Sequence, residues 1–261
     1  MPTGITVHFR VKNEENYCEA ALRAVLPLAE RVIVFDTAST DQTLEKIRSI
    51  HDSRIEIHEV PATDAQGLCE YRNQMAEMTK TEWYMIVDGD EIYPPECVGK
   101  IRERMKGVPE NIDRIKIYRK HFYKNLNFIS GLDGLGRIFR TETVRRTLHP
   151  TATNKVGHET PHVVYDPKKD LKDCSLNFPE DIFFFHFHYL PRSSRQADMG
   201  KMRGWRNPPF PVRPYFGPWP AAMRGDARKM TLKIALQCIL LNFWNLAAIG
   251  KIQASKISKA V

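Results

Sequence analysis

Apolar positions in the first 95 residues fall into four short runs, separated by segments with helical periodicity. The run at 32–35 is apolar on both faces, as expected of a parallel strand covered by helices on each side. The pattern predicts strands at 5–11, 31–35, 54–60 and 83–87. It predicts helices at 17–30, 39–50 and 64–79, with Asn13 as the N-cap of the first and a Ser39–Gln42 capping box opening the second.

Beyond residue 95 the pattern becomes longer, more polar and strand-like. After a helix near 95–106, we predict strands at 114–123, 137–140, 163–165 and 182–189. Six prolines between 207 and 220 exclude a regular helix or a central strand there. Residues 230–249 have a helical pattern with a narrow polar stripe on a broad apolar surface.

Strands that alternate with helices predict an α/β fold with a mainly parallel, Rossmann-like sheet flanked by helices. The second half predicts a mixed sheet, followed by a helical extension at the C-terminus. We expect one domain over residues 1–206, with halves at 1–95 and 96–206, and a proline-rich strap with a basic amphipathic helix over 207–261. Parallel sheets bind ligands at the carboxyl ends of their strands. Asp36 and the Asp88–Glu91 segment follow two of these ends.

The composition is that of a globular protein, with 42% hydrophobic and 27% charged residues. Five scattered cysteines without a C-x-x-C pair argue against a disulfide framework and a zinc site, and favour a reducing, cytoplasmic compartment. No secretory signal is recognised at the N-terminus. The net charge of +8 is lopsided, because residues 186–261 carry 13 Lys and Arg against 2 Asp and Glu.

Three carboxylates, of Asp88, Asp90 and Glu91, fall within four residues at the end of a predicted buried strand. Gly89 allows the backbone to turn tightly between them. Like charges this close are costly unless solvent or a cation neutralises them, and hard cations prefer oxygen ligands. The motif therefore indicates a divalent-cation site, with a solvated acidic turn as the alternative.

Four segments resemble family 2 glycosyltransferases with the GT-A fold, especially bacterial enzymes that build lipopolysaccharide cores and surface glycans. They are VHFRVKNEEN (7–16), VIVFDTASTDQT (32–43), EYRNQM (70–75) and WYMIVDGDE (83–91). The resemblance implies metal-dependent, inverting transfer of a sugar from a nucleotide-sugar donor, such as a UDP-sugar, to a glycan or lipid-linked acceptor. In this reading the halves at 1–95 and 96–206 bind nucleotide and acceptor. Mn²⁺ or Mg²⁺ would neutralise the diphosphate leaving group.

The same resemblance implies roles for residues of the first half. Asp36 would bind the nucleoside, with a turn aspartate as the alternative, and Asn13 and Glu15 would line the base pocket. Arg72 would reach the donor phosphates or sugar, unless it pairs on the helix surface with Glu70 or Glu77. Asp88 would contact the nucleotide and the metal, and Asp90 would be the direct metal ligand. Departures from the common DSGSTDGT segment at Thr37, Ala38 and Gln42 leave sugar and base preference open.

The second half resembles the family through GRIFR (136–140), GHE (157–159) and HFHYLPRS (186–193). On a strand, period two places His186 and His188 on one face, where they are candidate metal ligands or histidines satisfied by backbone and water. An inverting reaction needs a base for the acceptor hydroxyl. Glu159 is the first candidate and Asp133 is the alternative.

The basic C-terminal segment has several interpretations. A closing loop that helps to hold the donor diphosphate is one of them, through Arg192, Arg195, Lys201, Arg203 and Arg206. The helix at 230–249 is flanked by Arg and Lys, which predicts docking on the inner face of a membrane beside a lipid-linked acceptor. Packing on the domain or an oligomer contact are the alternatives. A sugar-nucleotide nucleotidyltransferase is a second enzyme hypothesis, although 11–16 lack its glycine-rich basic loop. A basic module that binds nucleic acid or membrane is the non-enzymatic one, but it leaves the acidic motif unexplained, so no nucleic-acid partner is expected.

Overall fold

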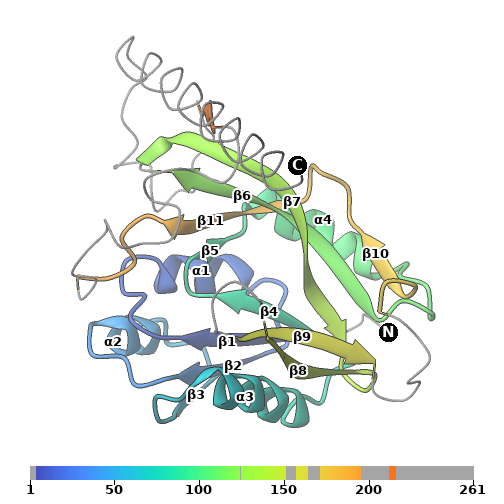
Figure 1. Cartoon of the computed structure of the whole chain (residues 1–261), viewed down its shortest axis with the longest axis horizontal. Helices are drawn as coiled ribbons and strands as arrows, with labels where there is room; N and C mark the ends of the chain where they lie inside the picture. The colour runs from blue at the N-terminus through green and yellow to red at the C-terminus, as the bar shows by residue number, and fades with distance from the viewer. Residues whose placement is uncertain (1–3, 124, 151–156, 164–170, 195–211, 216–261) are drawn as a thin grey trace, which may run out of the picture.

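The computed structural model describes residues 4–123, 125–150, 157–163, 171–194 and 212–215 (Figure 1). Within them lie a main sheet with ten strands and a separate two-stranded ribbon. The order in the main sheet is β3-β2-β1-β4-β7-β6-β11-β5, with β10 paired to β6 and β12 paired to β7. The ribbon consists of β8 and β9.

The first half of the sheet is parallel. Its strands are β1 (Ile5–Val11), β2 (Arg31–Asp36), β3 (Ile55–Glu59) and β4 (Trp83–Asp88). They are connected by α1 (Cys18–Val25), α2 (Thr43–Arg48) and α3 (Ala65–Glu77). Side chains of β4 alternate between two cores, because Met85 and Val87 pack in the cluster that contains α1, whereas Tyr84 and Ile86 pack beside α3. Both faces of β4 are therefore covered, which explains why its sequence is apolar without interruption from 83 to 87.

The second half is mixed. It contains β5 (Glu91–Ile92), α4 (Pro95–Met105), β6 (Arg114–Tyr123), β7 (Asn125–Arg140), β10 (Ser175–Asn177), β11 (Phe183–Tyr189) and β12 (Val212–Pro214). β7 runs antiparallel to both β4 and β6, so it joins the two halves into one sheet. The ribbon strands are β8 (Val144–Pro150) and β9 (Gly157–Val163).

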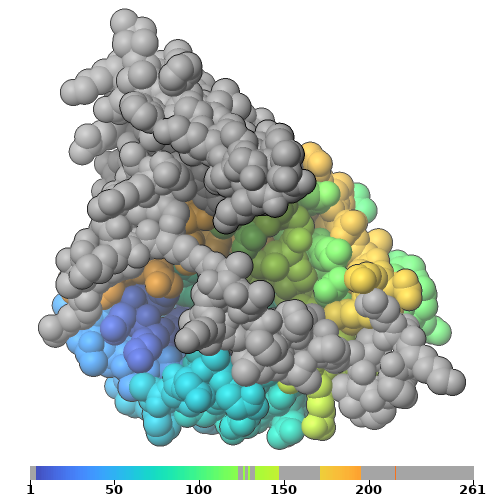
Figure 2. All heavy atoms as spheres, in the orientation of Figure 1, coloured from blue at the N-terminus to red at the C-terminus, as the bar shows by residue number. Residues whose placement is uncertain are grey.

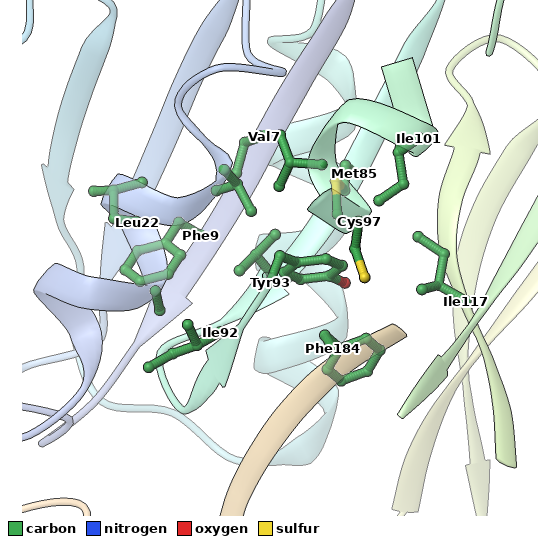
Figure 3. Packing of buried hydrophobic residues seen from close by; sticks show 14 of the residues in the cluster. Val7, Phe9, Leu22, Met85, Ile92, Tyr93, Cys97, Ile101, Ile117 and Phe184 are labelled. Carbon is green, nitrogen blue, oxygen red and sulfur yellow. The ribbon is translucent and has the colours of Figure 1, made fainter. Parts of the chain in front are cut away.

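The largest core lies where the two halves meet. Tyr93 is 1% exposed and stacks on Phe184, with 5.0 Å between the ring centroids. Figure 3 shows Tyr93 and Cys97 between Met85 of the first half and Ile117 and Phe184 of the second. Burial of these large apolar side chains holds the end of β4 against β11.

The β8–β9 ribbon lies beside α3 (Figure 1). The Asn73 side chain joins them, since its Nδ2 donates to the Arg146 carbonyl at 3.0 Å and its Oδ1 accepts from the Arg146 backbone N–H at 2.9 Å. Asn73 thus bonds the Arg146 backbone as a further strand would, while Pro161 of β9 is the partner of Arg146 in the ribbon. In the space-filling view the first half, blue to cyan, forms the lower surface and the green to orange second half lies above it (Figure 2).

The predicted α/β class with a mainly parallel first half and a mixed second half is confirmed. Asp64 caps α3 by accepting from the Gly67 backbone N–H at 2.9 Å, close to the predicted start of this helix. The strand predicted at 137–140 is the end of the longer β7. Its glycine-rich portion pairs with β6 through register shifts, which is why it did not look like a strand.

Two predicted helix caps were wrong. The residue that precedes α1 is Tyr17, not Asn13, and α2 begins at Thr43 after Gln42, which makes no side-chain cap bond. The Ser39 hydroxyl instead accepts from the Asn13 backbone N–H at 3.0 Å. The loops that contain Asn13 and Ser39 are hydrogen-bonded to each other, so neither residue caps a helix.

The helix predicted at 230–249 lies outside the described residues, as do parts of the proline-rich segment. Within that segment, Val212–Pro214 pairs antiparallel with β7, and Tyr215 contacts the rings of Phe122 and Phe185 at 5.5 and 5.7 Å between centroids. In the part of the chain that is described, no helix has the length and apolar character needed to cross a bilayer.

We expect Gly99→Ala to stabilise the protein by about 0.5–1 kcal/mol, because alanine favours a helix interior more than glycine does. A Cβ at this exposed position of α4 would meet no atom within 4 Å. Gly67→Ala in α3 is the matched control, since its Cβ would collide with the Thr63 side chain. Urea denaturation measures both, and a destabilised Gly99→Ala variant would contradict the prediction.

Candidate functional site

A cleft of about 860 Å³ opens at the carboxyl ends of β1 and β4. Its lining comes from both halves of the chain: the loop after β1, helix α3, the turn after β4, strands β6, β7 and β8, and strand β11 with the segment that follows it. The predicted site residues among them are Asn13, Arg72, Asp88, Asp90, His186 and His188. Residues predicted from separate segments of the sequence therefore share one cavity.

The turn after β4 is held against β11. Phe187 donates its backbone N–H to the Asp90 carbonyl at 2.9 Å, and His186 pairs with Glu91 across β11 and β5. Gly89 is required for close approach, because a Cβ there would lie 2.8 Å from Cβ and Cγ of Glu14. The turn is thus fixed from both sides.

Asp90, His186 and His188 form a candidate metal site, with ligand atoms all within 4.8 Å of one another. Asp90 Oδ2 lies 3.4 Å from His186 Nε2. Burial alone would raise the pKa of Asp90, but His186 outweighs it and holds that pKa below its usual value. Burial would likewise lower the pKa of His186, and the Asp90 carboxylate raises it instead. Burial, followed by the neighbouring His186, lowers the pKa of His188 to about 4.

This donor set fits a divalent cation. Asp90 Oδ2 and His186 Nδ1 are buried and make no hydrogen bond within the described residues. One carboxylate and two imidazoles are ligands that Mn²⁺ and other first-row divalent ions accept, whereas Mg²⁺ prefers oxygen alone. A bound cation would give Asp90 Oδ2 a ligand bond, where the described residues supply ion pairs with His186 and Arg192 but no hydrogen bond.

Asp88 has different neighbours from Asp90, although it lies only two residues before it in the sequence. Its carboxylate accepts from Arg72 at 2.8 Å and from Arg137 at 3.1 Å. Burial would raise its pKa, but Arg137 and Arg72 hold that pKa well below the usual range. Arg72 is buried and pairs with Asp88 in the cleft, which is not the helix-surface position of the alternative interpretation. Each oxygen of the Asp88 carboxylate thus accepts from one of the two arginines.

Glu91 is 0% exposed and forms an ion pair with Arg137. Burial raises its pKa to about 7, although Arg137 opposes that shift. The guanidinium of Arg137 also lies over the Phe184 ring, 5.3 Å from the centroid. Arg137 thus connects the acidic turn to the core behind it.

The residues predicted to bind the nucleoside lie in two loops that contact each other. Asn13 has a φ of 53° and accepts through Oδ1 from the Thr40 backbone N–H at 2.8 Å. Asp36 is 3% exposed and accepts from the Ser39 N–H at 3.0 Å, while its Oδ1 is buried without a hydrogen bond in the described residues. Its neighbour Thr37 lines the cleft.

Glu15 lies in the same loop as Asn13, after β1, and its carboxylate binds other protein groups. Its carboxylate accepts from the backbone N–H groups of Ser194 at 2.6 Å and Gln42 at 3.1 Å. Hydrogen bonds from Ser194 and Gln42 lower the pKa of Glu15 to about 2. Ser193 adds a bond from its hydroxyl to Asp41 at 2.5 Å. We call these contacts of Glu15 and Asp41 with Ser193 and Ser194 the clasp.

The two candidate bases differ in what surrounds them. Asp133 on β7 accepts two hydrogen bonds from Arg119, at 2.7 and 2.5 Å, and this pair outweighs burial and lowers its pKa. Glu159 belongs to β9 and pairs with Leu148, two residues along β8 from Arg146. The side chain of Glu159 lies outside the described atoms.

Several functional candidates were not predicted from the sequence. Arg137 and Glu14 line the cleft, and Glu14 accepts a hydrogen bond at 2.7 Å from Arg192, a candidate for the diphosphate that also lines it. Burial and the nearby Asp90 raise the pKa of Glu14 to about 9. His121 pairs with His186 across β6 and β11, with 4.8 Å between the ring centroids. The positions of Arg137 and His121 depend on strand register and that of Glu14 on loop conformation, neither of which follows from local sequence patterns.

Comparison with family models identifies the family of the chain. Residues 6–164 match the family model described as glycosyl transferase family 2. Among solved structures, the chain is similar to S. aureus TarS 1-349 in complex with UDP, at 19% identity and a TM-score of 0.42, covering 53% of this chain and 47% of that one.

It is also similar to glucosyl-3-phosphoglycerate synthase from Mycobacterium tuberculosis in complex with Mn²⁺, UDP and phosphoglyceric acid. That match has 22% identity and a TM-score of 0.35, and covers 46% of this chain and 43% of that one. The chain thus spans less than half the length of both proteins. No curated protein matches it.

We expect Glu15→Gln to destabilise the protein by about 1–3 kcal/mol at pH 7, because both oxygens accept from backbone N–H groups and an amide NH₂ would face one of them. The folded pKa of about 2 lies below the ordinary value of 4.5, so this stabilisation is complete above pH 4.5 and is lost as the pH falls toward 2. Urea denaturation at several pH values measures it, with Glu142→Gln at an exposed turn as the control. A pH-independent difference would contradict the prediction.

Proposed function

Because the chain belongs to glycosyl transferase family 2, we propose that it transfers a sugar from a UDP-sugar donor to a hydroxyl of a glycan or lipid-linked acceptor. The observation that carries this proposal is the meeting of Asp90, His186 and His188 in a cleft at the carboxyl ends of parallel strands. Parallel sheets bind nucleotides at that edge. Membrane docking by residues 230–249 and contact between copies of the chain stay predictions.

Asp90, His186 and His188 would hold the divalent cation, Mn²⁺ in preference to Mg²⁺, because two of the three ligands are imidazoles. When bound, the cation takes up the negative charge that develops on the diphosphate leaving group. Asp88 is assigned a different part, since Arg72 and Arg137 already engage its carboxylate. We assign it to orient these guanidiniums toward the donor.

The nucleoside would bind between the loop after β1 and the loop after β2. Asn13 and Asp36 support this assignment, because one shapes the loop and the other carries a buried oxygen without a described partner. Glu15 is better explained as part of the clasp, since its oxygens bind the Ser194 and Gln42 backbones. Its contribution to nucleotide binding is therefore indirect.

In the inverting step the acceptor oxygen forms a bond to the anomeric carbon while the bond from that carbon to the diphosphate oxygen breaks. The acceptor proton passes to a carboxylate, which we assign to Glu159. Asp133 is the weaker candidate, because its ion pair with Arg119 lowers its pKa and makes it a poorer base.

Asp90→Asn should weaken the Mn²⁺-dependent binding of UDP by at least about tenfold and abolish transfer, because it removes the one carboxylate of the metal group. Titration calorimetry with UDP, in Mn²⁺ and in chelator, measures the effect. Asp181→Asn is the control, since Asp181 is exposed and pairs with Lys100. The metal assignment is wrong if UDP binds equally tightly with and without Mn²⁺ and equally tightly to Asp90→Asn and the wild type.

Glu159→Gln should lower kcat for transfer or for slow donor hydrolysis by about 10²–10⁴-fold, the usual contribution of a general base. UDP binding with Mn²⁺ should stay unchanged, because the base does not hold the nucleotide. Asp133→Asn is measured beside it. If Asp133→Asn causes the larger loss of kcat at unchanged UDP affinity, the assignment of the base to Glu159 is wrong.

A further inference from the structure

Arg192 places a positive charge beside the candidate metal site. Its Nη1 lies 2.7 Å from Glu14 Oε1 and 3.8 Å from Asp90 Oδ2. The same Asp90 oxygen lies 3.4 Å from His186 Nε2 and makes no hydrogen bond within the described residues. A cation of the protein therefore lies at the oxygen that we assign to the metal.

The backbone on both sides of Arg192 is held by the loop after β1. Asn16 donates its side-chain Nδ2–H to the Pro191 carbonyl and its backbone N–H to the Arg192 carbonyl, both at 3.0 Å. The backbone N–H of Ser194 donates to Glu15 at 2.6 Å, as part of the clasp. None of these three bonds uses the side chain of Arg192, so we expect its substitution to leave the segment in place.

Glu14 holds the guanidinium near Asp90 but balances only part of its charge. The Glu14 side chain packs so closely on Gly89 that a Cβ there would lie 2.8 Å from it, and its backbone N–H donates to Thr43 Oγ1 at 2.8 Å. Glu14 is thus fixed beside the acidic turn. Burial, followed by Asp90, raises the pKa of Glu14, although Arg192 opposes that shift. Asp90 therefore supplies the second anion that the guanidinium requires.

The side chain of Arg192 is also accessible from the cleft. It is 33% exposed and lines the cavity together with Asp90, His186 and His188. A guanidinium has five N–H donors, so it can bind phosphate oxygens while it keeps a protein partner. A diphosphate in the cleft can therefore replace Asp90 as the anion that neutralises Arg192.

This position of Arg192 has opposite consequences for the two ligands of the site. Without nucleotide, the guanidinium neutralises Asp90 and repels a second cation at the same oxygen, so it weakens the binding of a divalent cation. With nucleotide, the negative charge of the diphosphate attracts both the guanidinium and the cation. Each ligand then strengthens the binding of the other, and by thermodynamic linkage both effects have the same size.

We propose that Arg192 is the counter-ion of Asp90 in the nucleotide-free site, where it opposes the binding of a divalent cation, and that it neutralises the diphosphate once the nucleotide binds. The inference rests on the proposed function and specifies how its site is loaded. The cation binds tightly only together with the nucleoside diphosphate, and not before it.

Titration calorimetry of the full chain at constant pH and ionic strength tests this role. Mn²⁺ is titrated without nucleotide, and UDP is titrated in saturating Mn²⁺. Both titrations are carried out on the wild type, Arg192→Gln, Arg192→Lys and Arg48→Gln. Arg48→Gln is the matched control, because it removes the same charge from the exposed end of α2, where Arg48 pairs with Glu59.

We expect Arg192→Gln to bind Mn²⁺ alone at least about threefold more tightly than the wild type, because the repelling charge is removed. The same variant should bind UDP in Mn²⁺ at least about tenfold more weakly, because a charge-assisted bond to the diphosphate is lost. A purely structural role of Arg192 would instead weaken both. Arg192→Lys keeps the charge, so its affinity for Mn²⁺ should stay closer to that of the wild type, and Arg48→Gln should change neither affinity.

The proposal is overturned if folded Arg192→Gln binds Mn²⁺ alone no more tightly than the wild type, or binds UDP in Mn²⁺ as tightly as the wild type does. Arg192→Met, which keeps the apolar stem, is the second uncharged variant if Arg192→Gln does not fold. Failure of the proposed function gives a different result. In that case UDP binds the wild type no more tightly in Mn²⁺ than in chelator, whereas Mn²⁺ alone still binds more tightly to Arg192→Gln than to the wild type.

Discussion

The contact between the acidic turn and β11 brings the two halves of the chain to one site. The hydrogen bond from Phe187 to the Asp90 carbonyl and the short pairing of β5 with β11 place Asp90 beside histidines almost a hundred residues later in the chain. Successive side chains of β11 point to opposite faces of the sheet. Phe185 and Phe187 enter the core, so their packing fixes the strand about its axis and directs His186 and His188 into the cleft.

Three carboxylates within four residues are tolerated because each is paired with a cationic or imidazole group, with Arg137 shared between Asp88 and Glu91. Asp88 meets two arginines, Asp90 meets His186, and Glu91 meets Arg137. The distribution also separates their chemistry, since Asp88 is held ionised by guanidiniums whereas Asp90 keeps a buried oxygen without a described hydrogen bond. A motif that looks uniform in sequence therefore contains three electrostatically distinct groups.

Local periodicity was enough to predict the parallel strands, the ends at which Asp36 and Asp88 lie, and the shared face of His186 and His188. It was not enough for contacts that depend on register or on loop conformation. Arg137 reaches Asp88 because residues 138–140 of β7 pair with β4 in one register, and no local pattern in the sequence gives that register. The failed caps had the same origin, because the hydroxyl of Ser39 binds a loop from a distant segment instead of its own helix.

The clasp determines when the nucleotide half of the cleft can be complete. It joins Glu15 and Asp41, from the first loops of the chain, to Ser193 and Ser194, which are made more than 150 residues later. Contacts of such long sequence separation form late in folding, after the loop-closure entropy of the intervening chain has been overcome. A nascent chain on the ribosome that ends before Ser193 therefore has the parallel strands and the acidic turn but lacks the partners of Glu15 and Asp41, so the loop to which we assign the nucleoside is completed late in synthesis.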